Sequence, residues 1–313
     1  MQRATDLVGA VGLMPLRVTF TPMSLPALVW LFLATTWGST WLFIRVGLDA
    51  GLPPITFAGI RFVVASVPLV IWLLIRRQPL RYSRADWWYL GVTGFLSFTV
   101  NYALVFWAVT HISSGLAAIL YTTFPIGGIL LAHWMLPAEP LTRRKAAGIT
   151  FAVAGVVLIF YSQVADEGSL ALLGALGTVV AALATALADI LVKKHIVHVE
   201  PVAITAVQMV FGFVPMLAIG IPLEGNPLHY PWTLRAVGAL FYLALVGSSL
   251  GFVLLYWLIQ RMEVTRTMLI PVLSTLIAAI LGVVVLGEEL SWRVLAGGAS
   301  IIVGLLIATR GRV

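Results

Sequence analysis

Ten long apolar segments constrain the fold of this chain more than any other feature. A helix needs about 20 apolar residues to cross roughly 30 Å of hydrocarbon, and a lone apolar strand would leave its backbone groups unpaired in lipid. We therefore predict an all-α polytopic membrane protein with ten transmembrane helices. The segments lie at about 25–45, 54–75, 87–109, 112–135, 145–162, 169–192, 201–222, 235–258, 264–286 and 292–309.

The composition agrees with a membrane protein and argues against several kinds of functional site. Apolar residues make up 61% of the 313 residues and charged residues 10%, with a mean hydropathy of +1.04. The chain has no cysteine, which excludes disulfides and thiolate metal sites. Its five histidines are scattered, and HExxH, GxSxG and GxxxxGK[ST] patterns are absent from the sequence. We therefore expect no metal, no cofactor, no direct ATP drive and no enzyme activity.

The distribution of basic residues predicts the orientation. With ten spans, fifteen of the nineteen Lys and Arg residues fall on the side of the N-terminus. The positive-inside rule then places both termini in the cytoplasm, in a cytoplasmic (inner) cell membrane. The basic residues behind the net charge of +7 thus serve to orient the chain in the membrane. We therefore expect the lipid bilayer as a partner and no nucleic acid. Residues 1–24 form a cytoplasmic leader in this interpretation, with a cleaved signal peptide as the alternative.

The second half of the chain repeats the first at an offset near 150 residues. Pro54 and Arg61 correspond to Pro201 and Gln208 at an offset of 147, and residues 101–109 align with 251–259 at an offset of 150. Each copy holds five spans, an odd number, so the second copy enters the membrane from the opposite side. Two inverted five-helix repeats, 25–162 and 169–309, predict a binding site at their interface and alternating access.

Several short motifs resemble a known family. They are WGSTWLFIRVG at 37–47, the set of Pro54, Phe57 and Arg61, and the span ends PAEPL at 137–141 and LGEEL at 286–290. Over residues 25–309 the chain resembles the ten-helix EamA-type members of the drug/metabolite transporter superfamily. The resemblance implies a secondary transporter, often an exporter of amino acids or other small metabolites, with a central cavity shared by both repeats.

Two charged residues inside predicted spans are the first candidates for substrate binding. Arg61 could hold a carboxylate bidentately, or could be a structural arginine bonded to backbone carbonyls or reaching the interface. Asp189 is the only carboxylate within a predicted span. It could bind a proton or an amine, or could pair with Lys193 at i+4. The two charges lie at different depths, so we expect no direct pair between them.

Polar and aromatic residues complete the candidate set. Asn101 lies near the middle of the third span, and Gln208 corresponds to Arg61 in the repeat. Helix packing is the alternative explanation for every polar or aromatic member. The predicted substrate-binding residues are Ser39, Trp41, Arg61, Asn101, Tyr121, Asp189, Gln208 and Tyr256.

Glycine and proline positions predict two features of packing. The fifth and tenth spans carry Gly148, Gly155, Gly297 and Gly304 and almost no polar residue, which favours a peripheral position and makes them candidates for a homodimer face. Pro125 and Pro271 lie at different distances from the glutamate that ends each span, which suggests a kink shifted by about one turn.

The leading hypothesis is an exporter of a small-molecule substrate, best an amino acid or a related metabolite. An exporter of lipophilic cations is the alternative within transport. Such an antiporter needs a membrane carboxylate, and the first span offers only Thr36, Ser39 and Thr40 where one would be sought. A channel or a non-transporting membrane receptor is the alternative from another class.

Overall fold

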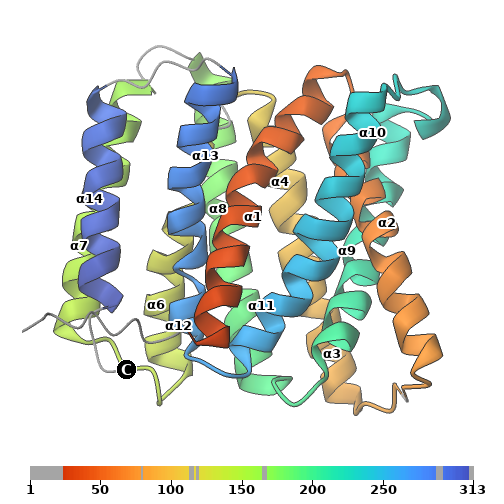
Figure 1. Ribbon diagram of the computed structural model, residues 1–313, viewed down its shortest axis with the longest axis horizontal. Helices are drawn as coiled ribbons and strands as arrows, with labels where there is room; N and C mark the ends of the chain where they lie inside the picture. Colours follow the sequence, from red (N-terminus) through yellow and green to blue (C-terminus); the bar gives the residue numbers. More distant parts are fainter. Residues whose placement is uncertain are drawn as a thin grey trace, which may run out of the picture.

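The computed structural model describes residues 24–78, 80–112, 116–117, 120–163, 168–286 and 292–309. Within this part of the chain every regular element is a helix, and seven stretches are long and apolar enough to cross a membrane. Shorter helices complete ten segments, so the predicted fold is confirmed (Figure 1). The first repeat contains α1 (Leu25–Asp49), α2 (Pro54–Ile75), α3 (Arg84–Gly94), the π-helix η1 (Phe95–Val100), α4 (Asn101–Val109), α6 (Thr123–Met135) and α7 (Arg143–Gln163). The second contains α8 (Gly168–His195), α9 (Pro201–Glu224), the 3-10 helix η2 (Pro227–His229), α10 (Leu234–Phe241), the π-helix η3 (Tyr242–Leu250), α11 (Gly251–Ile259), α12 (Val264–Thr267), α13 (Ile270–Leu286) and α14 (Trp292–Thr309).

The two repeats run in opposite directions. In Figure 1, α1 begins at the lower end of the molecule and α8 begins at the upper end. Matched hydrogen bonds join them. The Ser249 hydroxyl donates to the Ala65 carbonyl at 2.6 Å, and the Thr99 hydroxyl donates to the Gly212 carbonyl at 2.8 Å. Ser249 lies in η3 and bonds α2 of the first repeat, and Thr99 lies in η1 and bonds α9 of the second repeat. The two bonds are therefore symmetric between the repeats.

The segment predicted to run without interruption over 264–286 is broken. Helix α12 ends at Thr267, and α13 begins at Ile270 after a two-residue turn. A turn at Tyr121 and Thr122 precedes α6 in the same way. Pro125 and Pro271 therefore lie in the first turns of α6 and α13, where an absent N–H costs no helical hydrogen bond, and the expected mid-span kinks become breaks in the helix.

Helices α7 and α14 pack on each other at one edge of the molecule (Figure 1). Glycines make this approach close, because a Cβ on Gly148 would lie 2.5 Å from the Gly304 carbonyl oxygen and a Cβ on Gly155 would lie 2.5 Å from that of Gly297. The small residues that suggested a dimer face are thus used within one chain. A homodimer through these helices stays a prediction.

Helix starts at the two ends of the molecule are held by glutamates from the opposite repeat. Glu224, at the end of α9, accepts from the backbone N–H groups of Ile55 and Thr56 at 2.9 and 2.6 Å. Glu139 accepts from those of Val264 and Thr265 at 2.9 and 3.0 Å. A carboxylate satisfies N–H groups that a helix start leaves unpaired and interacts favourably with its dipole. These bonds tie α9 to α2 and the α6–α7 loop to α12.

We expect Glu139→Ala to destabilise the protein by roughly 1–3 kcal/mol, because two buried N–H groups lose a charged acceptor. Thermal unfolding in detergent measures the loss. Glu263→Ala is the matched control, since Glu263 is exposed and pairs with Arg266 only at 3.5 Å, which predicts a change below about 0.5 kcal/mol. Equal melting temperatures for the two variants would show that the Glu139 hydrogen bonds do not stabilise the protein.

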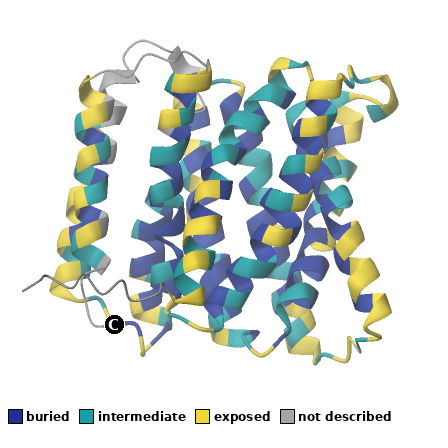
Figure 2. Cartoon of the chain, viewed as in Figure 1, coloured by how far each residue is buried: buried dark blue, intermediate teal, exposed yellow. Residues whose placement is uncertain are grey.

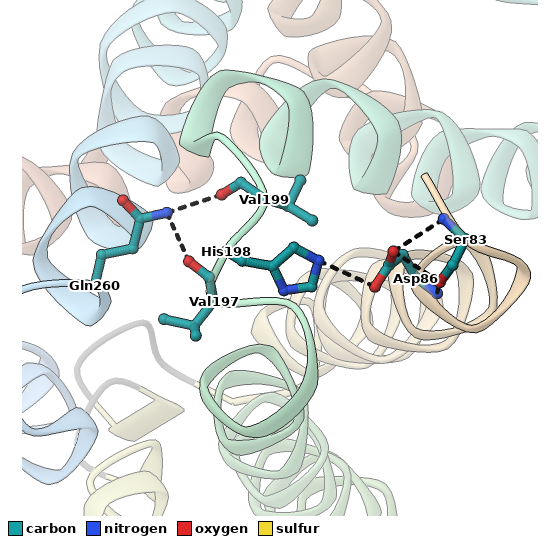
Figure 3. Close-up of polar contacts among 6 residues, drawn as sticks. All are labelled: Ser83, Asp86, Val197, His198, Val199 and Gln260. Atoms are coloured by element: carbon teal, nitrogen blue, oxygen red, sulfur yellow. Dashed lines mark hydrogen bonds and ion pairs between the residues drawn. The ribbon is translucent and has the colours of Figure 1, made fainter. Parts of the chain in front are cut away.

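A second group of polar contacts lies at the lower end of the molecule in Figure 1. Gln260 donates to the carbonyls of Val197 and Val199 at 3.0 and 2.8 Å, and His198 lies 3.3 Å from the Asp86 carboxylate (Figure 3). These contacts join α11 and α3 to the α8–α9 turn. Buried residues gather along the centre of the bundle while exposed ones cover its rim, as expected where outer faces meet lipid (Figure 2).

Candidate functional site

A central cavity lies between the two repeats, with room for water-sized molecules of about 90 Å³. Both repeats contribute to its wall, which is mostly apolar and aromatic. Among the residues that the structure describes, none from α3, α7, α9, α10 or α14 lines the cavity. The lining residues are Trp37, Thr40, Trp41, Ile44, Arg61, Asn101, Tyr102, Val105, Tyr121, Phe124, Thr185, Asp189, Phe252, Leu255, Thr267, Pro271, Ser274 and Thr275.

Arg61 reaches this cavity from α2 and is 1% exposed. Its Nε donates to the Ser248 hydroxyl at 2.8 Å and to the Leu243 carbonyl at 3.2 Å. The guanidinium carbon lies 4.9 Å from the centroid of the Tyr102 ring, a cation–π arrangement. Nη1 has no hydrogen-bond partner among the described residues. One edge of the guanidinium is therefore fixed to η3, while donor capacity remains on the rest of the group.

Asp189 reaches the same cavity from α8 and is 2% exposed. Within the described part of the chain its carboxylate makes neither an ion pair nor a hydrogen bond. The alternative pair with Lys193 is not formed, because the Lys193 amino group donates to the carbonyls of Ile259 and Met262 at 2.6 and 3.0 Å. Arg61 and Asp189 thus face one cavity without a mutual ion pair.

Tyr121 lies in the turn before α6 and is held by two polar neighbours. Its hydroxyl lies 3.0 Å from Asn101 Oδ1 and 3.1 Å from Thr185 Oγ1. Asn101 Nδ2 donates to the Ser97 carbonyl at 3.2 Å, so the mid-span amide is satisfied within the protein. The Tyr121 ring also meets Trp41 edge-on at 6.2 Å between centroids. This network orients an aromatic wall one helical turn from Asp189.

Three predicted site residues lie outside the cavity lining. Gln208 donates to the Thr93 hydroxyl at 2.6 Å and accepts from the Tyr256 hydroxyl, both inside the bundle. Ser39 donates to the Thr36 carbonyl at 2.7 Å and lies 2.6 Å from the Tyr242 hydroxyl. The structure brings together the other five candidates, Trp41, Arg61, Asn101, Tyr121 and Asp189.

The broken helix α12–α13 adds residues that the sequence did not single out as candidates. Thr267, Pro271, Ser274 and Thr275 line the cavity, with Ser274 donating to the Ala34 carbonyl at 2.9 Å. Trp37, on α1, also lines it and donates to the Gly247 carbonyl at 3.0 Å. A helix break exposes backbone to a cavity, and Pro271 close to a run of hydroxyl residues is the signal that could have located it.

We expect Gln208→Leu to reduce stability by about 1–3 kcal/mol, because the Tyr256 hydroxyl loses its acceptor and the Thr93 hydroxyl loses one donor. The KM of the folded variant should stay within about threefold of wild type, since the side chain does not reach the cavity. Transport assays at matched amounts of folded protein test this. A KM increase of tenfold or more without loss of stability would return Gln208 to the substrate site.

Comparison with protein families decides the class. The model of the EamA-like transporter family matches the chain twice, over residues 25–161 and 172–310. The chain belongs to the EamA-like transporter family. It is therefore a multi-pass membrane transporter of the drug/metabolite transporter superfamily, and the two matches fall on the two halves that surround the cavity.

Relatives match this EamA-like chain over nearly its full length. An uncharacterized transporter, YoaV of Bacillus subtilis (strain 168), is 24% identical over 273 residues, 87% of this chain and 92% of the relative. A probable amino-acid metabolite efflux pump of Salmonella typhimurium (strain LT2) is 28% identical over 294 residues, 90% of this chain and 93% of the relative. A crystal structure with 19% sequence identity superposes with a TM-score of 0.69 and covers 91% of this chain and 96% of its own.

Proposed function

We propose that this EamA-like transporter exports a small zwitterionic metabolite, an amino acid in the first instance, by alternating access. One observation carries the proposal: Arg61 and Asp189 line one cavity between inverted repeats, and no ion pair joins them. Charged residues inside a membrane domain are costly and normally serve a substrate or ion path. A molecule with a carboxylate and an ammonium group would supply the counter-charge for both.

Each charged group of the substrate has one candidate partner in the cavity. The unpaired part of the Arg61 guanidinium would take the substrate carboxylate, in a charge-assisted hydrogen bond. Asp189 would take the ammonium group. Trp41, Tyr121 and Phe252 would contact the substrate side chain, which favours an apolar or aromatic one. Export as the direction is supported by the name of the Salmonella relative, a probable amino-acid metabolite efflux pump.

Orientation in the membrane follows from charge. We infer that the end of the molecule carrying Arg76, Arg81, Arg143, Lys193 and Arg261 faces the cytoplasm, because positive loops remain on that side. The C-terminal end of α14 lies at this same end (Figure 1). The membrane would then be the cytoplasmic membrane, with substrate entering the cavity from the basic end.

Counterflow in proteoliposomes tests the function. Vesicles loaded with unlabelled L-phenylalanine should accumulate external radiolabelled L-phenylalanine transiently, as a carrier does and a channel does not. Phenethylamine, which lacks the carboxylate, and 3-phenylpropionate, which lacks the amine, should compete at least about 30-fold more weakly, because each leaves one buried charge unpaired. Leucine and alanine provide the series in side-chain size.

Two results would contradict the zwitterion proposal. Transport of phenethylamine at a rate equal to that of L-phenylalanine would favour a lipophilic-cation exporter in which Asp189 alone binds the charged group of the substrate. Absence of counterflow for every amino acid in the series, from protein that is folded and monodisperse, would remove amino acids as the substrate class.

A further inference from the structure

An open groove on the outer surface of the molecule runs along α3 and the start of η1, at the lower end in Figure 1. Phe211 of α9 adds a wall from the second repeat. The aromatic rings of Trp88, Phe95 and Phe211 line the groove and are 69%, 46% and 42% exposed. In a membrane protein, apolar rings on an outer face meet lipid. The groove is therefore open to the bilayer and touches both repeats.

The chemistry of the groove changes along its length in the order of a phospholipid. Arg84 begins α3 at the basic end of the molecule, and Trp87 and Trp88 follow one turn later. Tryptophan prefers the headgroup level of a membrane. The wall then becomes fully apolar as far as Phe95 and Leu96. Twelve residues from Arg84 to Leu96 span about 18 Å, close to half of the roughly 30 Å of hydrocarbon, so the groove matches one leaflet.

Four arginines lie within the nine residues 76–84, which connect α2 to α3. They are Arg76, Arg77, Arg81 and Arg84, and all four are exposed. Within the described residues none of them forms an ion pair, and only Arg76 stacks on a ring, that of Trp72, at 5.5 Å. The nearest acidic residue in the sequence, Asp86, accepts from the Ser83 hydroxyl at 2.8 Å and lies 3.3 Å from His198. The positive charge at this end of the groove therefore has no protein counter-charge.

We propose that one anionic phospholipid of the adjoining leaflet binds here. Its phosphate lies against Arg81 and Arg84, and one acyl chain lies in the groove against Trp88, Phe95 and Phe211. Four basic residues directly beside a membrane helix are the pattern that attracts anionic headgroups. A second copy of this chain is a poorer occupant, because a two-fold contact would set the two arginine clusters against each other.

The bound lipid joins the two repeats from outside. It contacts α3 and η1 of the first repeat and α9 of the second, beside the bond from the Thr99 hydroxyl to the Gly212 carbonyl. The site is separate from the central cavity, since no residue lines both. Lipid binding therefore stands or falls independently of the transported substrate.

Native mass spectrometry of the full-length protein tests the headgroup contact, with dioleoylphosphatidylglycerol and dioleoylphosphatidylcholine as probes that share their acyl chains. Wild type should bind one phosphatidylglycerol saturably and about 20-fold more tightly than phosphatidylcholine, since each arginine near an anionic headgroup contributes about fivefold. Arg81→Gln/Arg84→Gln should lower this ratio to about threefold or less. Arg143→Gln/Lys145→Gln removes the same charge at the start of α7, at the same end of the molecule, and should keep the wild-type ratio.

Trp88→Ala tests the acyl-chain contact separately. It should weaken both lipids by a similar factor, about threefold or more, and leave their ratio unchanged, because the two probes differ only in the headgroup. Trp134→Ala is the matched control, since Trp134 is 79% exposed near the end of α6 and lies outside the groove. It should change neither affinity.

Three results would overturn the proposal. Equal affinities of wild type for the two lipids would remove the headgroup site. Equal loss of preference in the two charge variants would show a general attraction to the basic end instead of binding at this groove. A lipid-free dimer that dissociates in Trp88→Ala would make a second copy of the chain the occupant.

Discussion

Arg61→Ala is expected to weaken L-phenylalanine transport by about 30- to 4,000-fold in kcat/KM, the largest functional effect that the structure predicts. The range corresponds to the 2–5 kcal/mol lost when one partner of a buried, hydrogen-bonded charge pair is truncated. Arg61→Lys should recover little, because an ammonium cannot keep the Nε bonds to Ser248 and Leu243 and also present a planar fork to a carboxylate.

Arg61 is also a structural residue, so the measurement must separate the two roles. Loss of packing would lower the amount of folded carrier and leave ligand preference unchanged. Loss of a carboxylate site would abolish the preference for L-phenylalanine over phenethylamine, which is a ratio and does not depend on protein amount. Arg45→Ala is the matched control, since Arg45 is partly exposed and pairs with Asp49 at 2.9 Å at the end of α1. An unchanged preference in Arg61→Ala would assign the arginine to structure alone.

Gly148→Val is expected to destabilise the protein by about 3 kcal/mol or more, the largest effect on stability. Its Cβ would lie 2.5 Å from the Gly304 carbonyl oxygen and 2.7 Å from the Ala308 Cβ. Neither obstacle is a flexible side chain, so α7 and α14 must separate along their length. Overpacking typically costs about 1–3 kcal/mol and more where backbone must move. Close contact of small residues is also the main attraction between helices in lipid.

Thermal unfolding in detergent tests this prediction. Gly238→Ala is the control, because a Cβ on Gly238 in α10 meets nothing within 4 Å, and there the change should stabilise the helix by about 0.5–1 kcal/mol. Spin labels on the exposed positions Val153 and Leu295 would report the separation of α7 and α14, on a chain that has no natural cysteine. A Gly148→Val variant as stable as wild type would show that the two helices do not depend on this contact.

The resemblance to EamA-type transporters rested on local motifs whose structural roles differ from one another. The Pro54 and Arg61 motif combines a helix start with a cavity residue, since Pro54 opens α2 and Arg61 reaches the central cavity two turns later. The PAEPL motif is structural, because its Glu139 caps the start of α12. The equivalent LGEEL glutamate falls at residues 287–291, outside the described residues. Motifs therefore identified the family without separating binding residues from packing residues.

Repeat symmetry predicted the architecture better than it predicted the site. Arg61 and Gln208 are equivalent in the repeat, and each bonds a hydroxyl residue of the other repeat, Ser248 or Thr93. Only Arg61 reaches the cavity. Gln208 instead fills its hydrogen bonds inside the bundle with Thr93 and Tyr256. Equivalent backbone positions thus carry different side chains into different surroundings, so a site cannot be copied from one repeat to the other.

The sequence by itself determined the ten apolar segments, their helical state and the inversion of the repeats. The bilayer permits only backbones that satisfy their own hydrogen bonds, and segment length and an odd count follow directly from the residues. Only the tertiary structure decided which side chains meet in the cavity, where the segment at 264–286 breaks, and that Gly148 and Gly304 face each other within one chain. A helix that is apolar on every face has no hydrophobic stripe to set its rotation, so the packing of its neighbours sets it instead.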